Sequence, residues 1–165
     1  MKRKENIVQG LNIGRFTSSA SQDVTVFMLG VRINSPLRPD AYVPVMRAYQ
    51  KMVKYLEQHP ETGFLGQELW VKRTILAVQY WESPEALQDF ASLTEAPHVQ
   101  AWRNFTQKAN HHVGLWHETY QVSAPARESV YLNMPNFGLG KALGVEPIGK
   151  ETSTAKRRMS RWNNS

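Results

Sequence analysis

The segment YWESPEALQDFASLTEAPHVQAWRNFTQKANHHVGLWHETYQV, residues 80–122, decides how this chain folds. It contains the end of one predicted strand, a helical region and a further strand over residues 113–122. Ser83 followed by Pro84 is typical of a helix start, because serine caps the first turn and proline fits the first helical position. The segment therefore predicts helical structure that connects two strands.

Hydrophobic periodicity extends this alternation toward the N-terminus. Residues 24–33 are rich in Val, Phe and Ile and predict a strand that is covered on both faces. Residues 40–59 repeat apolar side chains at helical spacing, and residues 64–81 predict a hairpin that turns near Lys72. The order strand, helix, strand, strand, helix, strand predicts an α+β, ferredoxin-like split βαβ fold with a four-stranded antiparallel sheet. A second copy of the chain is the simplest cover for the open sheet face, so we expect a homodimer.

Changes in composition divide the chain into four predicted regions. Residues 1–23 are polar and weakly patterned, which predicts a flexible N-terminal segment, and residues 24–125 form the predicted dimeric α+β barrel domain. Residues 126–149 are too apolar for a free linker and predict an ordered arm. Residues 150–165 predict a disordered basic tail.

Composition excludes several classes of function. The chain has 165 residues and no cysteine, so it suits one domain without disulfides, thiolate catalysis or cysteine metal sites. The net charge of +6 is concentrated at the two ends, so we expect no nucleic-acid partner, although an anionic partner for the tail remains an alternative. No apolar run is long enough to span a membrane, and no apolar signal segment follows the basic start. We therefore expect a cytoplasmic protein with no membrane partner.

Two histidines within residues 80–122 are the main candidates for chemistry. His98 is predicted on a helix whose same face carries Trp102 and Phe105. It is either a core histidine bonded to a backbone carbonyl or an axial ligand of haem iron. His117 is predicted on a strand face that it shares with Leu115. An imidazole on an apolar face needs either a structural hydrogen bond or a chemical role.

Four segments together resemble a known family: residues 79–83 (QYWES), 98–102 (HVQAW), 114–120 (GLWHETY) and 131–140 (YLNMPNFGLG). They are similar to segments of a bacterial and fungal family of monooxygenase-like proteins in the dimeric α+β barrel superfamily. The resemblance covers roughly residues 24–143. It implies the barrel fold and dimerisation.

A local similarity to haem-containing aldoxime dehydratases of the same superfamily implies roles for individual residues. His98 corresponds in order and approximate spacing to their axial haem ligand, with Trp102 and Phe105 beside a bound haem b. His117 corresponds to their distal catalytic histidine, and Arg32 is the candidate for their catalytic arginine. The chain is about half as long as those enzymes, and their catalytic serine has no clear counterpart.

The resemblance implies a haem-dependent lyase or monooxygenase that acts on a small hydrophobic substrate. We expect Tyr80, Leu115 and Trp116 to line the substrate pocket. One alternative is a cofactor-free monooxygenase of the antibiotic-biosynthesis type, in which His117 is the base. The other is a non-catalytic carrier of haem or of a hydrophobic ligand.

Overall fold

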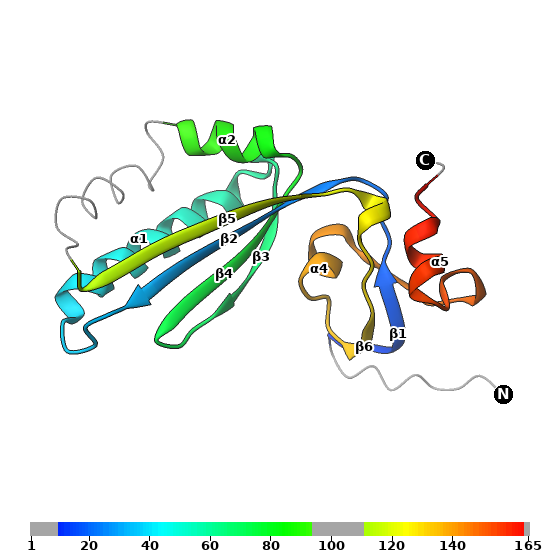
Figure 1. The fold of residues 1–165 in the computed structure, drawn as a ribbon, viewed down its shortest axis with the longest axis horizontal. Coiled ribbons are helices and arrows are strands. Elements are labelled where there is room, and N and C mark those ends of the chain that lie inside the picture. The colour runs from blue at the N-terminus through cyan, green and yellow to red at the C-terminus, as the bar shows by residue number, and fades with distance from the viewer. Residues whose placement is uncertain (1–9, 94–110, 164–165) are drawn as a thin grey trace. The chain divides into compact units, whose positions relative to one another are not determined.

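The computed structural model describes residues 10–93 and 111–163 and divides the chain into two compact units. One unit is Val24–Gln121, and the other combines Met1–Asp23 with Val122–Ser165. Each unit contains a sheet of its own (Figure 1). Within the described residues, no helix is both long enough and apolar enough to cross a membrane.

The sheet of the first unit has the strand order β3-β4-β2-β5. Its strands are β2 (Val24–Ile33), β3 (Phe64–Trp70), β4 (Thr74–Trp81) and β5 (Val113–Val122). Both β2 and β3 pair with β4 in antiparallel orientation. This is the strand order of the ferredoxin-like split βαβ arrangement, so the predicted α+β fold is confirmed.

Two described helices accompany this sheet, α1 (Pro39–Gln58) and α2 (Pro84–Ser92). The Ser83 hydroxyl accepts a hydrogen bond of 3.1 Å from the Ala86 N–H, as the Ser-Pro pair predicted. Figure 1 shows α1 running along the sheet.

Packing against α1 distinguishes the two sides of the sheet. Phe27 and Leu29 of β2 pack against the buried cluster that contains Met52 and Leu56 of α1. We call this side the helix-facing side. Successive strand residues point to opposite faces, so the neighbouring residues of β2 occupy the other side, which we call the open side. Its β2 members are Val26, Met28, Gly30 and Arg32.

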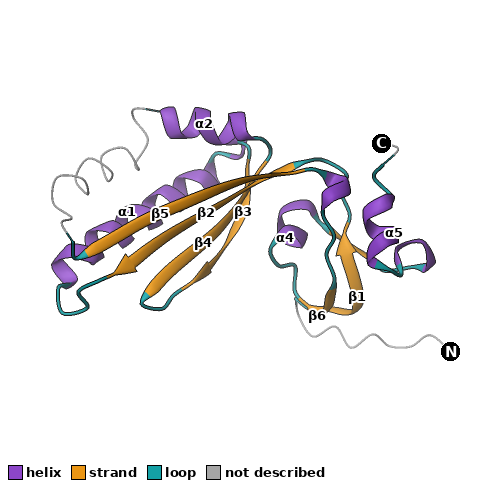
Figure 2. Cartoon of the chain, in the orientation of Figure 1, coloured by secondary structure: helices purple, strands orange, loops and turns teal. Residues whose placement is uncertain are grey.

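The second unit is a three-stranded antiparallel sheet with the order β6-β1-β7. The central strand β1 (Asn12–Ser18) pairs with β6 (Tyr131–Met134) and β7 (Val145–Pro147). Two short helices, α4 (Leu139–Leu143) and α5 (Ala155–Ser160), belong to the same unit (Figure 2).

Two expectations for the chain ends do not hold for the described residues. The segment expected to be flexible contains β1, because its backbone groups find partners in the arm more than 110 residues later in the chain. The tail expected to be disordered contains α5, in which the Arg158 side chain is only 5% exposed.

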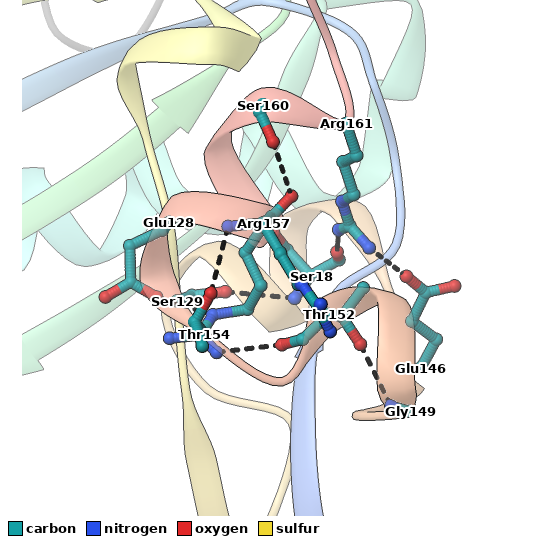
Figure 3. Close-up of polar contacts among 11 residues, drawn as sticks. Ser18, Glu128, Ser129, Glu146, Gly149, Thr152, Thr154, Arg157, Ser160 and Arg161 are labelled. Atoms are coloured by element: carbon teal, nitrogen blue, oxygen red, sulfur yellow. Dashed lines mark hydrogen bonds and ion pairs between the residues drawn. The ribbon is translucent and has the colours of Figure 1, made fainter.

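Polar contacts explain why the basic tail is ordered (Figure 3). The Arg158 Nε–H donates to the Glu128 carboxylate over 2.8 Å, and its Nη1–H donates to the Thr152 carbonyl over 2.9 Å. Arg161 donates to the Glu146 carboxylate and to the Ser18 carbonyl. These arginines therefore act as charged hydrogen-bond donors within the second unit.

Candidate functional site

A row of four side chains crosses the helix-facing side of the first sheet, one from each strand. Gln67 of β3 pairs in register with Gln79 of β4, and Gln79 pairs with Phe27 of β2. The Phe27 ring lies 5.5 Å from the His117 ring of β5. We call Gln67, Gln79, Phe27 and His117 the central row. It has an amide end, an aromatic middle and an imidazole end.

A buried hydrogen-bond network forms the amide end of the central row. The Tyr49 hydroxyl of α1 donates to Gln67 Oε1 over 2.5 Å. Gln79 Nε2 donates to the same oxygen over 3.3 Å, and Trp81 Nε1 donates to Gln79 Oε1 over 3.3 Å. The Gln79 side chain is 1% exposed, so these bonds offset the free-energy cost of burying its amide. We call these four residues the amide network.

Burial also determines the charge state of the amide network. Burial raises the pKa of the Tyr49 phenol to about 12, although its bonds to Gln79 and Gln67 act in the opposite direction. The phenol is therefore neutral at physiological pH and acts as a hydrogen-bond donor. The network fixes the positions of two amides without placing a charge under α1.

The imidazole end has a different character. His117 is exposed, and within residues 10–93 and 111–163 its imidazole has the Phe27 ring contact but no hydrogen bond or ion pair. An exposed imidazole can give or accept a proton. The central row therefore places one group suited to proton transfer beside an aromatic surface.

The predicted pocket residues do not all share this side of the sheet. Leu115 packs against the buried cluster of Val31, Ile75 and Val113, so it lies on the helix-facing side with His117. Trp116 lies on the open side, because a Cβ built on Gly30 would be only 1.9 Å from the Trp116 indole nitrogen.

Tyr80 and Arg32 also lie on the open side. Tyr80 follows the buried Gln79 and precedes the buried Trp81, so strand alternation turns it to the other face. The Arg32 Nη1–H donates to Thr74 Oγ1 over 2.7 Å, in register across β2 and β4. The sheet therefore separates Arg32, Tyr80 and Trp116 from His117 within one chain.

The predicted haem-binding residues His98, Trp102 and Phe105 lie outside the described residues. Among the residues that the structure does describe, no group of three His, Cys, Asp or Glu side chains could hold a metal ion. Haem iron needs only one axial ligand from the protein. On the central row the only imidazole is that of His117, so these residues offer no separate proximal ligand.

Sequence reasoning missed the amide network. It predicted an apolar helical repeat over residues 40–59 and a hairpin over residues 64–81, with no polar contact between them. The available signal was the position of Gln79 between Ala77 and Trp81, on a face that is otherwise apolar. A polar side chain at such a position needs a buried partner.

Comparison with known proteins places this geometry in context. Residues 24–139 match a family described as Monooxygenase af470-like. Monooxygenase af470 of Aspergillus fumigatus is 29% identical over 129 residues, which are 72% of this chain and 46% of that protein. The chain thus spans about half the length of this curated relative.

Two solved aldoxime dehydratases share the fold. The aldoxime dehydratase OxdRE, in complex with butyraldoxime, has a TM-score of 0.64 and 13% identity, over 82% of this chain and 43% of that chain. A second aldoxime dehydratase has a TM-score of 0.59 and 16% identity, over 98% of this chain and 47% of that chain. At these identities the similarity shows the fold alone.

Proposed function

The chain belongs to the Monooxygenase af470-like family, and we propose that it is an enzyme that transfers a proton to or from a small, largely apolar substrate. The observation that carries the proposal is the central row, in which the exposed imidazole of His117 adjoins Phe27 and the buried amide of Gln79 lies on the other side of that ring. His117 is the proposed catalytic acid or base.

The dimensions of the central row suit a small substrate. Neighbouring strands lie about 4.8 Å apart, so Gln79 and His117, two strands apart, are separated by about 10 Å along the sheet. The Phe27 ring between them offers an apolar surface. We therefore propose a substrate with a short apolar body and one acidic O–H or C–H group that reaches His117.

The proposed role of His117 is proton transfer at the polar end of the substrate. A positioned acid or base of this kind accelerates a reaction by about 10²–10⁴-fold. The amide network would keep the sheet surface rigid, because Tyr49 joins α1 to β3 through one hydrogen bond. Leu115 would add apolar surface on the same side.

The cofactor distinguishes two forms of this proposal. In the first, His98, Trp102 and Phe105 would hold haem b, which would supply an iron centre for chemistry on oxygen or on a substrate heteroatom. In the second, the enzyme is a cofactor-free monooxygenase, and the anion that His117 generates by removing a proton reacts directly with oxygen. A non-catalytic carrier of haem or of a hydrophobic ligand is the third candidate.

One set of measurements separates these candidates. The protein is expressed with added haem, its absorption spectrum is recorded, and conversion of short alkyl aldoximes and of phenols is followed by mass spectrometry. Butyraldoxime, which the structural relative OxdRE binds, belongs in the aldoxime set. A Soret band that is lost in His98→Ala supports the haem form. Oxygen consumption by metal-free protein supports the cofactor-free form.

The remaining outcomes are equally informative. Saturable binding of haem without turnover would identify a carrier. Turnover that is unchanged in His117→Ala would remove that residue from the mechanism and overturn the proposal.

We also propose that the open side of the first sheet binds a second copy of the chain. Half-buried apolar side chains cover this side, and a homodimer would bury them: Val26, Met28, Leu76 and Val78. Light scattering at micromolar concentration should give a dimer for the unmodified chain. Val78→Lys should give a folded monomer, whereas Gln50→Lys on the exposed surface of α1 should leave the dimer intact. A monomeric unmodified chain would contradict the proposal.

A further inference from the structure

Exposed apolar side chains gather at one end of the first unit. Within Val24–Gln121, the described large hydrophobic residues with high exposure number six, and four of them lie at the end of β3, in the turn after it or in the loop after β2. These four are Leu37 (94%), Leu69 (43%), Trp70 (46%) and Val71 (66%). Scattered single apolar residues need no explanation, but a cluster on neighbouring turns indicates a binding surface.

The two turns belong to the same end of the sheet. The Ile33 N–H donates to the Arg73 carbonyl over 2.9 Å. In return, the Arg73 side chain donates to the Ile33 carbonyl over 3.3 Å and to the Asn34 carbonyl over 3.4 Å. Figure 1 shows the β3–β4 turn and the β2–α1 loop at the same end of the strands. These contacts hold the turn after β3 against the start of the loop that carries Leu37.

This end of the sheet is also basic. Residues 32–38 and 69–74 contain Arg32, Arg38, Lys72 and Arg73 but no acidic residue. The Arg38 guanidinium is paired with the Asp40 carboxylate over 2.7 Å, which leaves Arg32, Lys72 and Arg73 as the positive charges of this surface. The nearest acid along β3 is Glu68.

We propose that this end of the unit binds the surface of a membrane that contains anionic phospholipids. Leu37, Leu69 and Val71 would enter the boundary between headgroups and acyl chains, while Lys72 and Arg73 would contact lipid phosphates. We call these five residues the loop-end patch.

Two features favour lipid over a second protein chain as the occupant. Leu37 and Val71 lie on turns rather than on a strand face, and they are more exposed than any other large hydrophobic residue described in the unit. The turn that carries Val71 also has two adjacent cations, Lys72 and Arg73, and no acidic residue, which suits an anionic surface.

The proposal changes one expectation from the sequence. The absence of a membrane-spanning run led us to expect no membrane partner, but surface binding requires only an apolar and basic patch. The inference does not depend on the proposed chemistry of His117. It would nevertheless suit an enzyme with an apolar substrate, because such a substrate accumulates in lipid.

Vesicle co-sedimentation of the full chain tests the proposal. The protein should sediment with vesicles of phosphatidylglycerol mixed with phosphatidylcholine, and much less with phosphatidylcholine alone. Because each basic residue near such a surface contributes about fivefold to partitioning, Lys72→Ala with Arg73→Ala should lower the partition coefficient by about 25-fold. Leu37→Ser, at a side chain that is 94% exposed, should lower it without affecting the fold.

Matched variants separate the loop-end patch from simple charge attraction. Lys51→Ala with Lys54→Ala removes the same charge from exposed positions of α1 and should leave the partition coefficient nearly unchanged. An equal loss in both double variants, or no loss in the patch variants, would overturn the proposal. The proposal would also be overturned if Leu37→Ser changed the oligomeric state but not vesicle binding, because that result would assign the patch to a second protein chain. Trp70 is left unchanged because it lies on the open side of the sheet, where we place the second copy.

Discussion

The His117 imidazole lies 5.5 Å from the Phe27 ring, and Phe27 pairs in register with Gln79 of the buried amide network. The imidazole is exposed, whereas the Gln79 side chain is 1% exposed. One aromatic ring therefore separates a group that can exchange protons with a ligand from a group that is fixed inside the protein. The proposed proton transfer therefore belongs to β5, whereas the buried amide network belongs to β3, β4 and α1.

His117→Ala should reduce turnover of any substrate of this site by about 10²–10⁴-fold, the usual contribution of a general acid or base. The fold should be retained, because the imidazole is exposed. Thr119→Ala is the matched control, since Thr119 is the next exposed residue on the same side of β5. Rates should be compared at saturating substrate, with circular dichroism as the check on folding. Equal effects of the two variants would contradict a specific role for His117.

Tyr49→Phe should lower the free energy of unfolding by about 1–2 kcal/mol, because it deletes a buried hydrogen bond to Gln67 Oε1. Tyr42→Phe is the control: among the described residues the Tyr42 hydroxyl makes a single bond, of 3.5 Å, to the Pro36 carbonyl, and its loss should change stability by less than about 0.5 kcal/mol. Urea denaturation measures both values. Similar values for the two variants would show that the amide network contributes little to stability.

Tyr49 should also make stability depend on pH in the alkaline range. Its pKa is about 12 in the folded chain and about 10 when unfolded, so the folded state holds the proton more tightly. The resulting stabilisation is complete below pH 10 and is lost as pH rises toward 12, by about 1.4 kcal/mol per unit. The free energy of unfolding, measured by urea denaturation at several alkaline pH values, should therefore fall more steeply with rising pH for the unmodified chain than for Tyr49→Phe. Parallel pH dependences would contradict the raised pKa.

Gly30→Ala should destabilise the first unit by about 1–3 kcal/mol, because the new methyl group would meet the Trp116 indole at 1.9 Å. Gly114→Ala provides the control, since its methyl group would approach Arg32 Cβ at an ordinary 3.5 Å. The combination of Gly30→Ala with Trp116→Leu should recover part of the loss, which thermal unfolding can measure. No recovery would mean that strain elsewhere causes the effect.

Hydrophobic alternation alone predicted most of the first sheet. The observed bounds of β2 and β5 are the predicted ones, residues 24–33 and 113–122, and β3 and β4 form the hairpin that was predicted over residues 64–81. The strand β1, with the sequence NIGRFTS, carries little of this signal. Its stability comes from pairing with β6 and β7, and a local pattern cannot reveal partners that lie so far along the chain.

The candidate site was predicted less completely than the fold. The sequence placed His117 on the same strand face as Leu115, which the structure supports. It also grouped Tyr80 and Trp116 with His117, but the side on which each residue lies depends on strand alternation and on packing against α1. The amide network depends on a helix residue, Tyr49, that reaches two strands at once. Such a contact follows from tertiary packing rather than from periodicity.

Removal of residues 150–165 should destabilise the second unit, because α5 supplies charged donors to the rest of that unit. The Arg158 side chain is 5% exposed and bonds to the Glu128 carboxylate over 2.8 Å. Arg158→Ala should therefore cost about 1.5–3 kcal/mol, the usual contribution of a hydrogen bond to a charged group. Arg157→Ala is the matched control, because Arg157 is exposed in the same helix and its side chain donates within the tail itself, to the Lys150 carbonyl and the Ser153 hydroxyl.

Hydrogen exchange of the β1 amides measures this effect locally, because β1 is the central strand of the second sheet. Exchange should accelerate in Arg158→Ala and in the shortened chain but not in Arg157→Ala. The amides of β2 and β4 should be unaffected in all three, since these strands belong to the first unit. Unchanged exchange in the shortened chain would show that β1, β6 and β7 are stable without the tail, and that the Arg158 ion pair follows the fold rather than supporting it.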